Sequence, residues 1–243
     1  MGPSALRPGL TATTVRSGTG DDPLGHLGED PLAFRSPNRT LVAQGTAARI
    51  ELGERSGWAD DVASVSQALA AIERRGPDRD PASGPVAFCA FPFDRRRPAT
   101  ALIPRVLRGR DAARSSWMTT IDADRSQAAP SPLASEPGET VPSSGATGGD
   151  EPVELRLQAT TSDADWMAKV IEMTTRMAEG HLEKAVLFRE LALSSTATLD
   201  PGALYRRLLP TAPAGYVFCI DGFVGASPEL LVSRVGDMVR AQP

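Results

Sequence analysis

The clearest succession of strands in this sequence lies at residues 216–241, which read YVFCIDGFVGASPELLVSRVGDMVRA. Short apolar runs alternate there with Asp221-Gly222, Ser227-Pro228 and Gly236-Asp237, pairs that favour turns because of their backbone preferences. This end of the chain is therefore predicted to be rich in β-structure, with strands at 216–220, 223–226, 230–235 and 238–241.

Helices and strands alternate immediately before this stretch. Residues 153–157 alternate apolar and polar side chains, which predicts a half-exposed strand. Ser162 is a typical N-cap, and the apolar stripe after it predicts a helix that ends at Gly180. Residues 184–193 predict a further strand, and Asp200-Pro201 predicts the start of a second helix.

The sequence of the first half of the chain predicts a mixed layer of strands and one helix. Asp61 is expected to cap a helix that Gly76 closes, because apolar residues follow it at helical spacing. Strands are predicted around and after it, at 41–43, 48–52, 85–93, 100–107 and 115–121. Strands, helix and hairpins together predict the α+β class.

Composition divides the chain into four parts. Residues 1–30, rich in Gly, Pro, Thr and Asp, are predicted to be a disordered N-terminal arm. Residues 31–127 form the expected N-terminal α+β region. In residues 128–150, twelve of 23 residues are Pro, Ser or Gly, which predicts a disordered linker or insertion. Residues 151–243 are expected to form the next folded region.

The charge pattern argues against a general nucleic-acid-binding protein. The net charge is -4 and the pI is about 5.3. Arginines at 95–97, with Arg105, Arg108 and Arg110, form a local exception. Because no aromatic residues are interleaved with them for base stacking, we expect a solvated loop and strand face and no nucleic-acid partner.

The cysteines, the histidines and the hydropathy of the sequence limit which further classes of protein this chain can belong to. Cys89 and Cys219 each lie in an apolar run, as is typical of buried free thiols in a reducing compartment. His26 and His181 are the two histidines, too few for a multi-histidine metal site. No apolar run approaches the roughly 20 residues that cross a membrane, and residues 1–20 lack a secretory signal. We therefore expect a cytoplasmic protein without a membrane partner.

Two side chains could carry proton chemistry. Lys184 precedes the apolar run 185–188, and Glu229 follows Ser227-Pro228 in a turn at a predicted strand junction. Burial of such groups would lower the pKa of a lysine and raise that of a glutamate, which would make them a base and an acid. Taken singly, each is also compatible with an ordinary solvent-exposed side chain.

The segments around these residues, LEKAVLFR at 182–189 and GFVGASPELL at 222–231, together resemble the signature of the chorismate-utilising enzymes, and in detail the isochorismate synthases. That family carries one motif close to EKVVLAR and another of the form GxSPExL. The first is matched by Lys184 and Arg189, with Ala185 and Phe188 as departures. The second is matched by Gly225, Ser227, Pro228, Glu229 and Leu231.

The resemblance implies an isomerase that converts chorismate into isochorismate for menaquinone or siderophore biosynthesis. By this resemblance, Lys184 would activate a water molecule that attacks C2 of chorismate, and Glu229 would protonate the C4 hydroxyl of chorismate as it leaves. The family also implies Mg²⁺, which holds the substrate carboxylate; its ligands are expected beyond the matched segment. The implied fold is part of the chorismate-utilising fold, β-sandwich sheets flanked by helices, with residues 151–243 as the start of an incomplete catalytic domain.

Two alternatives stay open. Salicylate synthases also keep a lysine at the position of Lys184, whereas anthranilate and aminodeoxychorismate synthases resemble the chain near Glu229 without that lysine. The chain could also be a truncated, non-catalytic fragment or a partner-dependent subunit, because the resemblance covers only the first part of such an enzyme.

Overall fold

A computed structural model of the chain describes residues 9–18, 21–28, 31–52, 57–77, 83–94, 96–97, 99–123 and 155–242. The chain divides into two compact units: unit 1 comprises Met1–Ser135 and Asp200–Pro243, and unit 2 comprises Glu136–Leu199. This corrects the expectation of one continuous region at 151–243, because residues from Asp200 onward pack with the N-terminal half. The predicted linker at 128–150 lies outside the described residues.

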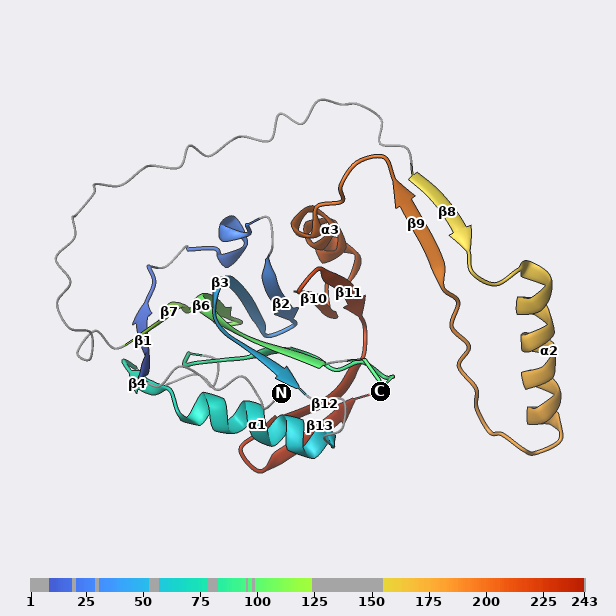
Figure 1. The fold of residues 1–243 in the computed structure, drawn as a ribbon, viewed down its shortest axis with the longest axis horizontal. Helices are drawn as coiled ribbons and strands as arrows, with labels where there is room; N and C mark the ends of the chain where they lie inside the picture. The colour runs from blue at the N-terminus through green and yellow to red at the C-terminus, as the bar shows by residue number, and fades with distance from the viewer. Residues whose placement is uncertain are drawn as a thin grey trace. The chain divides into compact units, whose positions relative to one another are not determined.

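Unit 1 is built on a nine-stranded sheet with the order β11-β10-β2-β3-β6-β7-β1-β4, in which β5 also pairs with β6 (Figure 1). Neighbouring strands are antiparallel except β1 and β4. The strands are β1 (Leu10–Arg16), β2 (Leu32–Ser36), β3 (Arg39–Leu52), β4 (Glu73–Arg75), β5 (Phe88–Ala90), β6 (Ala99–Asp111), β7 (Ser116–Ala123), β10 (Tyr216–Ile220) and β11 (Phe223–Ser227).

The longest strand, β3, continues through a glycine that the sequence predicts to separate two short strands. Gly45 has a positive φ of 64°, and the register against β6 shifts between Thr46 and Ala48. Glycine adopts this backbone conformation at little cost. The chain therefore forms a β-bulge at this point and the strand goes on, instead of ending.

Strand β1 lies in the region that the sequence predicts to be a disordered arm. It pairs along its whole length with β7, and its side chains Leu10 and Ala12 are buried in the main core cluster. The sequence LTATTVR is rich in β-branched residues, which suit a strand. The expectation of disorder is thus corrected for Leu10–Arg16, because β7 supplies hydrogen-bond partners that the local sequence does not reveal.

Helix α1 (Trp58–Ala70) begins and ends earlier than predicted. Its N-cap is Gly57, whose amide donates to Asp60 Oδ2 at 3.1 Å. Asp61, the predicted cap, lies inside the helix and is only 4% exposed. The helix ends before Gly76 because the intervening residues enter the sheet as β4.

The apolar side of α1 packs on the sheet to form the main core. Val65 and Ala68 of the helix contact a cluster that includes Ile50 of β3 and Ile103 of β6. Burial of one such side chain stabilises the fold by about 1.5–3 kcal/mol. Figure 1 shows α1 running along the sheet below these strands.

Helix α3 (Pro201–Leu208) covers β10 and β11, and it begins where the sequence predicts. Asp200 caps it by accepting a hydrogen bond from the Gly202 amide at 2.8 Å. Tyr205 is completely buried against Val217 and Cys219 of β10. Burial raises the pKa of the Tyr205 phenol well above its usual range.

Unit 2 consists of β8 (Leu155–Ala159), α2 (Asp163–Ala178) and β9 (Leu191–Ser195), and β8 pairs antiparallel with β9. Ser162 caps α2 as predicted, since its hydroxyl accepts from the Asp165 amide at 3.1 Å. At the other end the Gly180 amide donates to Met177 and the His181 amide donates to Arg176. With Gly180 at φ 79°, these bonds form the Schellman closure that the glycine predicts.

A second hairpin in unit 1 pairs β12 (Leu230–Val235) with β13 (Met238–Gln242). With β10 and β11, it confirms the succession of strands predicted for 216–241, and the mixed α+β class is confirmed as well. Cys89 and Cys219 are free thiols as predicted, and burial raises the pKa of Cys89. None of the described helices is long and apolar enough to cross a bilayer.

Candidate functional site

Lys184 lies in an irregular segment that ends at Glu190, and not in the strand predicted from residue 184. The backbone N–H and C=O groups of a strand need hydrogen-bond partners on a neighbouring strand. Strand β8 provides such partners for β9 only as far as Ala159, which lies opposite Leu191. One further bond joins the Thr160 amide to the Glu190 carbonyl at 3.2 Å before the chain enters α2. The strand therefore starts at Leu191, and the prediction is corrected.

The surroundings of Lys184 within unit 2 are open to solvent. Val186 is 80% exposed, Phe188 is 88% exposed, and Lys184 itself is exposed. The apolar neighbours that would desolvate an amine are present in the sequence, but within this unit they do not enclose it. Arg189 anchors the segment, because its guanidinium donates to the Asp163 carboxylate in the first turn of α2.

Glu229 lies in the turn between β11 and β12 of unit 1, as the sequence predicts, and its side chain is exposed. Ser227 shapes this turn. Its hydroxyl oxygen accepts from the Glu229 amide at 3.2 Å, and the hydroxyl donates to the Glu229 carbonyl at 3.1 Å. Pro228 has no amide hydrogen to continue a ladder. The Ser-Pro-Glu sequence thus ends β11 and holds the backbone of Glu229.

The glycine of the same motif is required by packing. Gly225 lies opposite Phe218 in the β10–β11 pair, and a Cβ there would lie 2.5 Å from Phe218 Cζ. A Cβ at Gly215 would lie 2.7 Å from the Ser227 carbonyl oxygen. Both distances are too short for a real side chain, so the two glycines allow the hairpin to pack closely beneath the turn that carries Glu229.

An ion pair that local sequence patterns do not reveal holds the other end of this hairpin. Asp221, in the β10–β11 turn at φ 52°, accepts two hydrogen bonds from the Arg49 guanidinium, at 2.9 and 3.1 Å. These bonds hold the pKa of the Asp221 carboxyl below its ordinary value. The turn predicted at Asp221 is confirmed, but its partner lies 172 positions away in the sequence.

The two candidate catalytic side chains belong to different units, Lys184 to unit 2 and Glu229 to unit 1. Each is accessible within its own unit, and an amine and a carboxyl are suitable groups for proton transfer to and from a small molecule. Among the described residues, no three His, Cys, Asp or Glu side chains gather as metal ligands would. The described surroundings of Lys184 and Glu229 therefore do not fit a Mg²⁺ site.

The sequence profile of a family described as "Chorismate binding enzyme" matches residues 32–242. This chain belongs to that family. The match begins at β2 and includes both Lys184 and Glu229, so the membership that the two motifs predict is confirmed.

Three relatives are isochorismate synthases by name. The chain is 29% identical over 229 residues to the putative isochorismate synthase MenF of Mycobacterium tuberculosis, covering 88% of this chain and 48% of the relative. It is 27% identical over 220 residues to DhbC of Bacillus subtilis, covering 86% and 47%. It is 26% identical over 215 residues to EntC of Escherichia coli, covering 86% and 48%. The chain spans about half the length of these curated relatives.

Two solved structures share the fold. One is a putative 2,3-dihydroxybenzoate-specific isochorismate synthase, DhbC, from Bacillus anthracis, with a TM-score of 0.56, 23% identity, and coverage of 89% of this chain and 49% of that one. The other is MenF, the menaquinone-specific isochorismate synthase from Escherichia coli, with a TM-score of 0.55, 19% identity, and coverage of 93% and 52%. At such identities the likeness establishes the fold.

Proposed function

We propose that this chain carries the base and the acid of an isochorismate synthase, an isomerase that converts chorismate to isochorismate. One observation carries the proposal: Lys184 and Glu229 stand 45 residues apart within the family match, each inside its own motif. The names of the three relatives favour this activity over that of a salicylate synthase.

In the proposed reaction, Lys184 as a free amine takes a proton from a water molecule whose oxygen bonds to C2 of chorismate. Both ring double bonds shift, C1=C2 to C1=C6 and C5=C6 to C4=C5, and the C4–O bond breaks. The departing hydroxyl takes a proton from the Glu229 carboxyl and leaves as water. One water enters and one leaves, so the reaction is an isomerisation, and the lysine finally holds a proton while the glutamate has lost one.

Such a base and acid need surroundings that neither unit provides by itself. At neutral pH an exposed amine is protonated and an exposed carboxyl is ionised, which is the unproductive state for both roles. Enclosure in a site of low polarity reverses both preferences. Val186 and Phe188, 80% and 88% exposed, are the apolar side chains that enclosure would cover beside Lys184.

The exposed apolar surface of unit 2 favours a second candidate, a subunit that acts only together with further protein. Helix α2 has no buried residue, and its Met167 and Ile171 are 56% and 62% exposed. Leu157 of β8 is 66% exposed. An amphipathic helix gains most of its stability from covering its apolar face. On this proposal, the partner covers α2 and encloses Lys184.

The test is the conversion of chorismate by the protein, followed by chromatography of the product. Lys184→Ala should lower kcat at least about a hundredfold, because a positioned general base contributes roughly 10²–10⁴. Lys169→Ala is the matched control, since it removes the other lysine of the sequence from the exposed surface of α2. It should leave kcat within about twofold of the parent.

Activity of Lys184→Ala close to that of the Lys169→Ala control would rule out the assigned base. Conversion that appears only when a partner polypeptide is added would favour the partner-dependent subunit. We also propose Mg²⁺ as the cofactor of the reaction, with ligands other than the described residues around Lys184 and Glu229. Removal of the ion with a chelator should abolish conversion, and adding it back should restore conversion.

A further inference from the structure

A cavity of about 530 Å³ lies in unit 1, at the end of the sheet where the β2–β3 and β6–β7 turns meet. These turns are neighbours because β3 pairs with β6 in a register that places Arg39 opposite Asp111 and Thr40 opposite Arg110. The short helix η1 (Pro23–His26) and the segment after α3 complete the walls. The charged residues of its lining are Arg35, Arg39, Arg110, Arg114, Asp22 and Asp111.

The cavity carries an excess of positive charge, since its lining includes four arginines and two aspartates. Both carboxylates already have partners. Asp22 accepts from the Leu24 amide at 3.1 Å and pairs with Arg110 at 3.2 Å. Asp111 accepts from the Ser115 amide at 2.8 Å. The two carboxylates are therefore engaged in bonds within the walls of the cavity, and its lining keeps a net positive charge.

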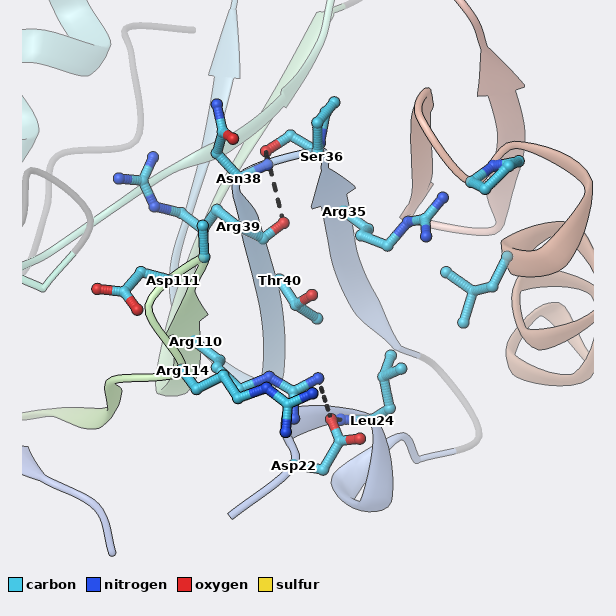
Figure 2. A pocket seen from close by; sticks show the side chains of 14 residues that line it. Asp22, Leu24, Arg35, Ser36, Asn38, Arg39, Thr40, Arg110, Asp111 and Arg114 are labelled. Atoms are coloured by element: carbon cyan, nitrogen blue, oxygen red, sulfur yellow. Dashed lines mark hydrogen bonds and ion pairs between the residues drawn. The ribbon is translucent and has the colours of Figure 1, made fainter. Parts of the chain in front are cut away.

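Arg114 adds charge that no acid of the described residues balances. It stands in the β6–β7 turn with a positive φ of 63°, an uncommon conformation for a residue with a side chain. Its amide donates to the Asp111 carbonyl at 3.1 Å, which fixes this turn. Figure 2 shows Arg114 and Arg110 extending in the same direction, toward Asp22.

Arg35 supplies positive charge at the opposite wall. Its guanidinium donates to the Ala212 carbonyl after α3, and its buried Nε has no hydrogen-bond partner among the described residues. Figure 2 shows this side chain directed from β2 toward α3, away from the end that holds Arg110 and Arg114. The cavity thus presents guanidinium groups at two separated walls, with the hydroxyl-bearing Thr40 between them.

We infer that this cavity binds a small molecule that carries at least two anionic groups, phosphate or carboxylate. Arginine is suited to both groups, because its planar fork can donate two hydrogen bonds to one anion. The volume lies within the range of small-molecule sites. The lining contains neither Lys184 nor Glu229, so this site is distinct from the proposed catalytic residues and independent of the proposed isomerase activity.

The test is titration calorimetry of the full chain with pyrophosphate and, in parallel, with citrate, at low and at physiological salt. We expect saturable binding of one molecule per chain. Arg114→Gln and Arg110→Gln should each weaken it about tenfold or more, because each removes a charge-assisted hydrogen bond. Arg105→Gln is the matched control, since Arg105 is exposed on β6 outside the cavity and its loss changes the net charge equally.

Binding of pyrophosphate alone would assign a phosphorylated ligand, and binding of citrate alone would assign a carboxylate ligand; either supports the site. Absence of saturable binding with both anions would overturn the inference. If Arg105→Gln and Arg114→Gln weaken anion binding equally, the inference is also overturned, because the anion would then be attracted by the overall positive charge and not by this cavity. Circular dichroism of each variant confirms that the fold is retained, and Arg114, in an exposed turn, is the variant least able to disturb it.

Discussion

Asp221 shows how one side chain connects distant parts of the sheet. Its two hydrogen bonds with Arg49 join the β10–β11 turn to β3, beside a cavity of about 430 Å³ that Gly45 and Thr46 also line. Gly45, just before the bulge between Thr46 and Ala48, and Asp221 in its turn therefore line the same cavity. Both side chains are 46% exposed, so solvent screens the pair and its contribution to stability is modest.

Replacing this carboxylate should change the pH dependence of stability. Because Arg49 lowers the pKa of Asp221, the pair stabilises the fold above the ordinary pKa of an aspartate, and this contribution is lost as pH falls through the lowered value. Asp221→Asn keeps a residue that tolerates positive φ. We expect it to lower the free energy of unfolding by about 0.2–1 kcal/mol at pH 7, and to converge with the parent in acid.

Urea denaturation across the acid range measures both effects. Asp237→Asn is the matched control, because Asp237 also lies in a hairpin turn and has no ion pair within the described part of the chain. A difference between Asp221→Asn and the parent that persists undiminished at low pH would show that the effect does not come from the Arg49 pair.

At the scale of elements, the β10–β11 hairpin depends on the close approach of Gly225 to Phe218. Gly225→Ala places a methyl group 2.5 Å from the Phe218 ring, so the ring or the strand must shift. We expect a loss of about 1–3 kcal/mol in the free energy of unfolding, as for other overpacked sites. Chemical denaturation measures it, and reduced conversion of chorismate should accompany it, since the hairpin carries Glu229.

Gly28→Ala is the control for this change, because a Cβ at Gly28 meets no atom within 4 Å. It should leave stability within about 0.5 kcal/mol of the parent. A Gly225→Ala variant as stable as Gly28→Ala would mean that Phe218 rearranges without cost.

The helices and strands also show where local sequence patterns are sufficient to predict the ends of an element. Ser162 and Gly180 bound α2 as predicted, because capping bonds form within a few residues of the cap. The predicted strand from Lys184 is wrong because an apolar run shows only that residues can form a strand, whereas its start depends on how far the partner strand extends. The predicted cap at Asp61 is wrong because Gly57 begins the helix one turn earlier.

For the whole molecule, the described core lies in unit 1, whereas no described residue of unit 2 is buried and many of its apolar side chains are exposed. Phe188→Ser should therefore change the free energy of unfolding by less than about 0.5 kcal/mol, as at other surface sites. Leu102→Ala, at a residue only 3% exposed on β6, should cost about 2–5 kcal/mol. Urea denaturation compares the two. A large loss in Phe188→Ser would show that Phe188 is covered in solution.

Local sequence signals determined the strands at 216–241, the ends of α2, the free thiols and the two motifs that identify the family. Each of these features depends on residues close together in the chain. Tertiary structure alone decided that Leu10–Arg16 joins the sheet, that residues from Asp200 onward return to the first unit, and that arginines from separate turns line one cavity. These outcomes depend on which distant strands pair, and pairing is set by the packing of the whole sheet.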